Sequence, residues 1–331
     1  MNELVRPRTS ERDPVRPRER DAIIAALRAG EVPARGLHHL VVGRGAEMEA
    51  LASDLDAVAR GGARCRAVVA PNGAGKTFLL AVLHRAALAK NLVAARVDLT
   101  PGHRLHGTGG QAQALYRAVT ARLSTRARPD GGALPALLER VVSDVVAKAA
   151  EEGRGPDRAL REHLAPLAEL PGGYDFALAV EGYWRGHDSG DEHLKAQALR
   201  WLRGEFTSKA DARAALGVRT IISDGNWYDS LKLLARLCRL GGHDGLVVLL
   251  DEVAVLHRIA NPQARDANYQ RILGIWNDTL QGGQTVWGSP SGSPRRPSWT
   301  PAGDGTPIPP LAPAWPRTPS PGTGSSTTRG P

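Results

Sequence analysis

The segment from Ala70 to Thr77 constrains this chain more than any other part of its sequence. It reads Ala-Pro-Asn-Gly-Ala-Gly-Lys-Thr, follows the apolar residues 67–69, and precedes an apolar run at residues 78–83 that is typical of a helix. A turn of small residues at a helix N-terminus presents backbone N–H groups and the positive end of the helix dipole. The pattern therefore predicts a phosphate-binding loop, or P-loop, between a buried strand at 66–69 and a helix ending near residue 90.

The residue types in this loop have separate chemical roles. Gly73 and Gly75 allow a close backbone wrap, Lys76 is placed to neutralise the β- and γ-phosphates, and the Thr77 hydroxyl is a ligand for Mg²⁺. Ala70 stands where the pattern usually has Gly, and that position tolerates a methyl group. The alternative is an ordinary strand–turn–helix with a chance Gly-Lys-Thr. The residues predicted to surround the nucleotide are Ala70, Pro71, Asn72, Gly73, Ala74, Gly75, Lys76 and Thr77.

A second motif lies far along the chain, where five apolar residues, 246–250, run into Asp251 and Glu252. Such a run is typical of a strand buried on both faces of a parallel sheet. Ligands of open α/β sheets bind at the carboxyl ends of the strands. We therefore expect Asp251 to hold Mg²⁺ and Glu252 to polarise the attacking water, with Lys76 and Glu252 as the catalytic residues. A helix N-cap followed by a first-turn acid is the structural alternative.

The two motifs together predict an ATP site with Mg²⁺. GTP is disfavoured, because the only guanine-specificity candidate, at residues 226–229, lacks the Lys that should follow its Asn. Asp98 closes a further predicted strand, residues 92–99, at the same rim of the sheet. It is a weaker candidate for the metal or water site, since capping the following turn explains it better.

Composition and charge indicate where the protein is located in the cell, but they do not identify a binding partner. The chain has 331 residues, 42% of them hydrophobic, and a net charge of +9. Residues 1–20 carry +2 (six Arg, four acids) and residues 284–331 carry +3 (four Arg, one Asp), so about half the excess lies at the ends. DNA contact therefore stays an open alternative. Two cysteines without metal spacing, no secretory signal and no apolar run of membrane length favour a cytoplasmic location.

The chain divides by composition into an arm, a domain and a tail. Residues 1–20 read as a flexible basic arm and residues 21–283 as a P-loop ATPase domain. Lys76 and Asp251 are separated by 174 residues, far more than one strand–helix–strand unit needs, so we expect a large helical insertion at about 111–217. The predicted fold class is α/β, a P-loop NTPase with a parallel sheet flanked by helices.

A short segment before the P-loop, residues 39–44, resembles the opening segment of AAA-type ATPases. In those proteins the segment lies near the adenine, so the resemblance implies His39 and Gly43 as nucleotide contacts. A plain turn is an equal alternative. An AAA or ASCE-like arrangement of the sheet follows from the same resemblance.

The order of motifs also resembles the BrxD-like P-loop ATP-binding proteins of BREX phage-exclusion systems, over about residues 21–283. The P-loop and acidic strand are shared by a whole superfamily. The segments that suggest this group are 104–110, 128–135 and 200–205, reading Arg-Leu-His-Gly-Thr-Gly-Gly, Arg-Pro-Asp-Gly-Gly-Ala-Leu-Pro and Arg-Trp-Leu-Arg-Gly-Glu. The resemblance implies an AAA-type ATPase of bacterial antiviral defence that works with other defence proteins and forms homo-oligomers.

The family pattern stops near Gln284. Residues 284–331 hold half of the chain's 24 prolines, and such a segment is predicted to be disordered. A natural Pro-rich tail and an out-of-frame reading of a GC-rich gene both explain it, and the abrupt change favours the second. The sheet would then lose a strand beside residues 246–251, and ATP binding would survive better than hydrolysis. A nucleotide-switched DNA- or protein-binding module without turnover, and a small-molecule kinase, are the alternative functions.

Overall fold

Two buried strands lie at the centre of the fold, and a third strand of two residues extends their sheet. Strand β1 (Val93–Asp98) pairs in parallel with β2 (Leu246–Asp251), in a register that runs from Val93 opposite Leu246 to Asp98 opposite Asp251. Strand β3 (Trp287–Gly288) pairs in parallel with the other edge of β2. Every residue of β2 is buried, as the uninterrupted apolar run predicts for a strand covered on both faces.

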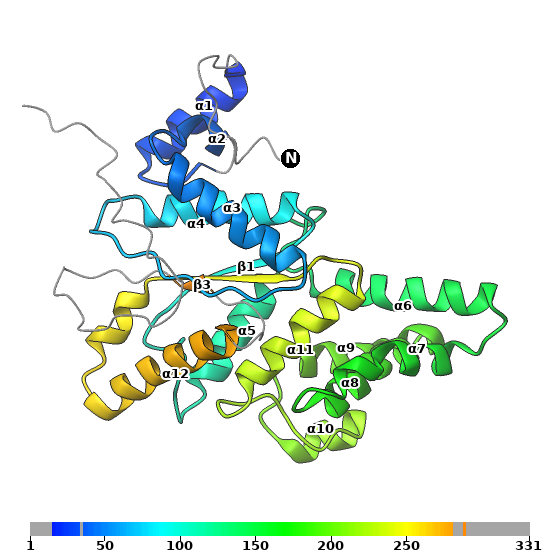
Figure 1. The fold of residues 1–331 in the computed structure, drawn as a ribbon. Helices are drawn as coiled ribbons and strands as arrows, with labels where there is room; N and C mark the ends of the chain where they lie inside the picture. Colours follow the sequence, from blue (N-terminus) through cyan, green and yellow to red (C-terminus); the bar gives the residue numbers. More distant parts are fainter. Residues whose placement is uncertain (1–14, 34–35, 281–286, 289–331) are drawn as a thin grey trace, which may run out of the picture.

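The computed structural model describes residues 15–33, 36–280 and 287–288. These residues form a helix-rich α/β fold around the small parallel sheet (Figure 1). The predicted α/β class and the parallel pairing of the acidic strand agree with it. Most of the predicted arm and tail, together with the last three residues of the predicted domain, lie outside the described residues, namely residues 1–14, 281–286 and 289–331.

The two faces of the sheet belong to separate hydrophobic clusters because side chains alternate along a strand. One face packs with helices α3 (Gly45–Ala59) and α4 (Lys76–Ala89), and the other packs with α5 (Gln111–Ala121) and α11 (Trp227–Leu240). Figure 1 shows these helix pairs above and below the strands. The strand residues on the α4 face are Ala94, Val247 and Leu249, and those on the opposite face are Val93, Ala95, Val97, Leu246, Val248 and Leu250.

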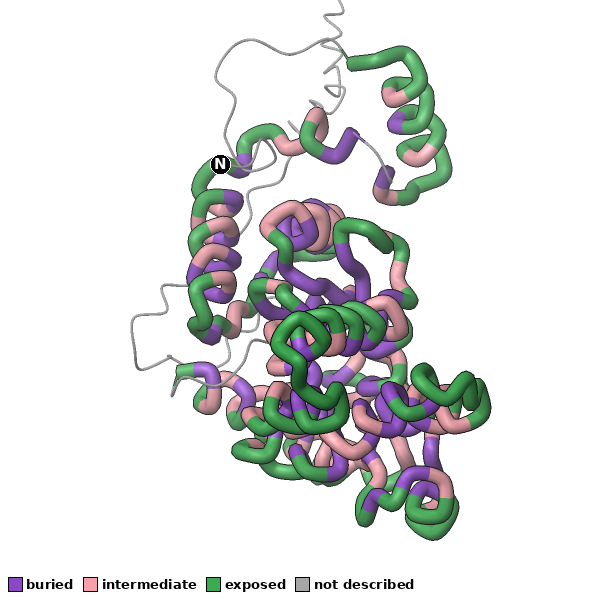
Figure 2. Tube along the Cα trace, turned by 90° about the vertical axis from the view of Figure 1, so that its right-hand side faces the viewer, coloured by how far each residue is buried: buried purple, intermediate pink, exposed green. Residues whose placement is uncertain are grey.

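The remaining elements surround this three-layer centre. Helix α1 (Pro17–Arg28) is mostly exposed and lies with α2 (Leu37–Leu40) beyond the α3–α4 layer (Figure 2). Helix α12 (Pro262–Leu280) follows the 3₁₀ helix η2 (Val253–Arg258). The helices that lie mainly beside α11 are α6 (Leu134–Glu151), α7 (Pro156–Leu164), η1 (Ala165–Leu167), α8 (Gly173–Ser189), α9 (Glu192–Leu202) and α10 (Lys209–Leu216).

One strand prediction is wrong. Residues 66–69 form no strand, and only Ala67 and Ala70 make single β-bridges there. Residues 218–222 also form no strand, because the backbone N–H groups of Arg219 and Thr220 donate to the buried carboxylate of Asp175 instead of to a neighbouring strand. A side chain that takes the backbone donors removes the ladder that a strand requires.

The segment boundaries also differ from the composition-based limits. Helix α1 begins at Pro17, inside the predicted arm, because proline suits the first turn of a helix and Ile23 buries its side chain. At the other end, Trp287 and Gly288 lie inside the predicted tail and pair with β2. They extend the sheet by one short strand on the edge of β2 that faces away from β1.

Candidate functional site

The turn from Ala70 to Thr77, called here the Ala70–Thr77 turn, leads directly into α4. Gly73 and Gly75 both have a φ of 78°, in the left-handed region that favours glycine. Gly75 is the N-cap of α4, and no side chain among the described residues caps this helix. The first N–H groups of α4 therefore point into the turn without a side-chain acceptor.

Lys76 is the first residue of α4 and is only 8% exposed. Its Nζ donates to the carbonyl oxygens of Ala70, at 3.0 Å, and Pro71, at 2.9 Å. The ammonium group is thus held inside the turn by two neutral acceptors. Most of the turn around it is accessible, since Pro71, Asn72, Gly73 and Thr77 are exposed.

Arg44 brings a second buried cation to the same turn. It precedes α3 as its N-cap residue and is 7% exposed. Its Nη2 donates to the carbonyl oxygen of Ala74, and a Cβ placed on Gly75 would lie 3.1 Å from that same nitrogen. Glycine at position 75 therefore both permits the left-handed turn and leaves room for the guanidinium.

The carboxyl end of β2 carries the two predicted acids in different surroundings. Asp251 is 3% exposed and its Oδ1 accepts a hydrogen bond of 2.9 Å from the Glu252 backbone N–H. Glu252 is exposed and has a φ of 56°, one of two positive values among the described non-glycine residues. Such a backbone costs of order 1 kcal/mol and is common at functional sites.

The register of the sheet places Asp98 directly opposite Asp251. Because Val97 and Leu250 belong to the cluster on the α5 face, alternation directs both aspartates toward the α4 face, on which the Ala70–Thr77 turn lies. Asp98 therefore lies at the same rim of the sheet as the acidic motif. Within the described residues, however, no hydrogen bond or ion pair joins the turn to Asp251 or Glu252.

The two residues that the AAA resemblance implies as adenine contacts have different surroundings. The Nε2 atom of His39 lies 3.6 Å from a carboxylate oxygen of Glu19 in α1, so this carboxylate would compete with a nucleotide for the imidazole ring. Gly43 is exposed with a φ of 71°, and a Cβ placed there would meet nothing within 4 Å. Glu19, His38 and His39 also offer ligand atoms within 4.8 Å of one another, a set that suits a divalent metal but that no sequence motif marked.

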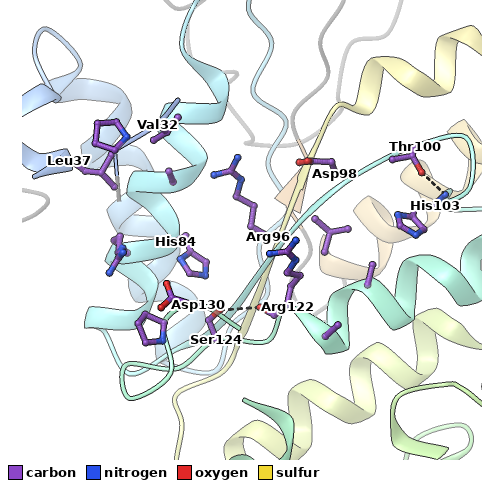
Figure 3. Close-up of a pocket in the computed structure, with 17 residues that line it drawn as sticks. Val32, Leu37, His84, Arg96, Asp98, Thr100, His103, Arg122, Ser124 and Asp130 are labelled. Carbon is purple, nitrogen blue, oxygen red and sulfur yellow. Dashed lines mark hydrogen bonds between the residues drawn. The ribbon is translucent and has the colours of Figure 1, made fainter. Parts of the chain in front are cut away.

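A separate cleft of about 720 Å³ lies beside β1 and α4, and it contains no residue of the Ala70–Thr77 turn (Figure 3). Burial, and then the charges of Arg85 and Arg96, lower the pKa of His84 in this cleft from 6.5 to about 4, against an opposing effect of Asp130. Sequence reasoning did not single out this cleft. The signal that could have marked it is Arg96, a charged residue between the apolar residues Ala95 and Val97 of β1.

Across the described residues, no helix combines the length and apolar character needed to cross a bilayer. A family model described as "BREX system ATP-binding protein BrxC/D" matches residues 15–288. The match begins two residues before α1 and ends at Gly288 of β3. Comparison with curated proteins and with solved structures gives no match.

Proposed function

Because the chain belongs to the BrxC/BrxD family of BREX system ATP-binding proteins, we propose that the Ala70–Thr77 turn is a P-loop that holds the ATP phosphates. The observation that carries this proposal is the burial of Lys76 in a glycine turn at the uncapped start of α4. A helix start with unused N–H groups and a buried ammonium is suited to a polyphosphate. Arg44 adds a second cation on the same turn, so the donor set fits the ligand.

We further propose that the protein is a Mg²⁺-dependent ATPase in phage defence. Lys76 neutralises phosphate charge, while Thr77 and Asp251 supply oxygen ligands suited to Mg²⁺. Bound Mg²⁺ would supply charge neutralisation at the phosphates. Glu252 is accessible to solvent, and we assign it the orientation of the attacking water.

Three more detailed expectations from the sequence belong to the same proposal. They are a P-loop NTPase sheet of AAA or ASCE-like type, a helical insertion at about 111–217, and nucleotide contacts from His39 and Gly43. Family membership supports other BREX proteins as partners. DNA contact, self-association and a cytoplasmic location rest on the sequence alone.

Binding of a fluorescent ATP analogue tests the phosphate site. Lys76→Ala should weaken binding by about 100-fold, because it removes a charged donor from buried phosphate contacts worth about 3 kcal/mol. Lys90→Ala is the matched control, since Lys90 caps the other end of α4 and pairs with Asp56. Equal affinity of Lys76→Ala and the parent protein would refute the site.

Phosphate release tests the catalytic part. Glu252→Gln should keep nucleotide affinity and lower turnover by about 100-fold or more, the usual effect of losing a positioned proton acceptor. A parent protein that binds ATP and releases no phosphate would instead favour the nucleotide-switched binding module. The shortness of β3 supports this binding-module alternative. Only two residues extend the sheet beyond β2, and loss of a strand there is expected to impair hydrolysis more than ATP binding.

A further inference from the structure

Arg44 is a buried cation whose hydrogen bonds are incomplete. One guanidinium nitrogen, Nη2, donates to Ala74, whereas the other, Nη1, is buried and has no hydrogen-bond partner. No ion pair among the described residues includes Arg44. An arginine presents five N–H donors and stays charged at every physiological pH, so this site holds a charge without an anion.

Stability of the fold does not account for such a residue. Removing a guanidinium from water is energetically costly, and one neutral carbonyl acceptor offsets only part of that cost. Arg66 shows how the charge of a partly buried arginine is usually compensated, because it forms an ion pair with the buried Asp54 of α3. Arg44 has the same degree of burial as Asp54 and lacks such a partner.

The surroundings of Arg44 favour an anion as the missing partner. The residue stands at the N-terminus of α3, a helix of 15 residues, and its guanidinium contacts the turn at the N-terminus of α4. Two helix N-termini thus meet at one turn, and each carries partial positive charge. Lys76 adds a full charge there. Arginine is also the side chain best suited to phosphate oxygens, which it can bind with two parallel N–H groups.

We propose that Arg44 is a phosphate ligand of the nucleotide site, supplied by α3 of the same chain. This inference rests on the proposed ATP site in the Ala70–Thr77 turn. Nη1 donates to a phosphate oxygen, and Nη2 ties the guanidinium to the backbone of the turn. The AAA resemblance implies that the neighbouring Gly43 lies near the adenine, whereas the burial of Arg44 and its contact with Ala74 assign this side chain to the phosphates.

The test compares Arg44→Met with Arg60→Met, because Arg60 is an exposed residue at the opposite end of α3. Arg44→Met should weaken ADP binding by about 10- to 100-fold and reduce the increase in Tm that tripolyphosphate gives. Without ligand its Tm should stay at or above the parent value, since an uncompensated charge is removed. The dependence of ADP affinity on salt should become shallower, which loss of a purely structural contact would not produce.

Unchanged ADP affinity in Arg44→Met would overturn the inference, and so would a lowered Tm without ligand combined with an unchanged salt dependence. If that variant fails to fold, Arg44→Lys decides. It keeps the charge with a single donor group and should lose about tenfold in ADP affinity, so parent affinity would count against Arg44 as a ligand. Failure of the nucleotide site itself is distinguishable, because the parent protein would then bind neither ADP nor tripolyphosphate.

Discussion

The helices beside α11, from α6 to α10, are called here the helical layer. This layer and the Ala70–Thr77 turn differ in whether their buried polar groups have hydrogen-bond partners. Where α5 meets the helical layer, the hydroxyl of Tyr116 in α5 donates to the Leu202 carbonyl of α9 at 3.0 Å, and the Trp201 indole of α9 donates to the Thr220 carbonyl at 2.9 Å. At the turn, Lys76 has only carbonyl acceptors and Arg44 leaves one nitrogen unbonded. Satisfied polar groups fix a structure, whereas an unsatisfied buried cation indicates where a ligand binds.

One other buried side-chain atom of the described residues has no partner, namely Nε of Arg104. It lies on the glycine-rich loop between β1 and α5, outside the helical layer. The two nitrogens without a hydrogen-bond partner therefore lie in different segments. Arg44 contacts the Ala70–Thr77 turn, and Arg104 follows the carboxyl end of β1. The contrast implies that variants in the helical layer should change stability, while variants at the turn should change nucleotide affinity.

The largest effect on stability should come from Asp175→Ala. The Asp175 carboxylate is 5% exposed and accepts hydrogen bonds from the backbone N–H groups of Arg219, at 3.1 Å, and Thr220, at 2.8 Å. Removing it leaves buried donors unsatisfied, so the free energy of unfolding should fall by about 3 kcal/mol in urea titrations. ADP affinity should not change, and Asp188→Ala, at an exposed site of the same helix, should have almost no effect.

A smaller effect should follow from the titration of His84, which lies on α4 and lines the cleft beside β1. Its pKa is about 4 in the folded protein and 6.5 when unfolded, so the unfolded state binds the proton more readily. Stability from this group is complete above pH 6.5 and is lost as the pH falls to 4, on the order of 2 kcal/mol. His84→Gln should reduce the dependence of the free energy of unfolding on pH over this range. A control variant at the exposed His187 should keep the parent pH dependence.

The smallest effect should come from Tyr116→Phe, which removes the hydroxyl that joins α5 to α9 in the helical layer. The Leu202 carbonyl would lose its donor, and the free energy of unfolding should fall by about 1 kcal/mol. Tyr174→Phe is the control, because Tyr174 is 59% exposed. If Tyr116→Phe lowered ADP affinity without lowering stability, the contrast between the two regions would fail.

Local chemistry explains which parts of the site could be predicted. The Ala70–Thr77 turn and α4 follow from small residues before an apolar helical run, and β2 follows from five apolar residues before two acids. The strand at 66–69 was a wrong prediction because a strand requires a partner along its length, and β-propensity does not supply one. The absence of a strand at 218–222 depends on Asp175, which lies more than 40 residues earlier.

The sequence by itself determined a glycine turn before α4, a buried acidic strand and membership of an ATP-binding family, because each depends on neighbouring residues or on the order of motifs. Only the tertiary structure decided that Asp98 stands opposite Asp251 and that Arg44 contacts Ala74. Those contacts join residues separated by 153 and 30 positions in the chain. Burial and pairing at such separations depend on how helices and strands pack, which no local pattern specifies.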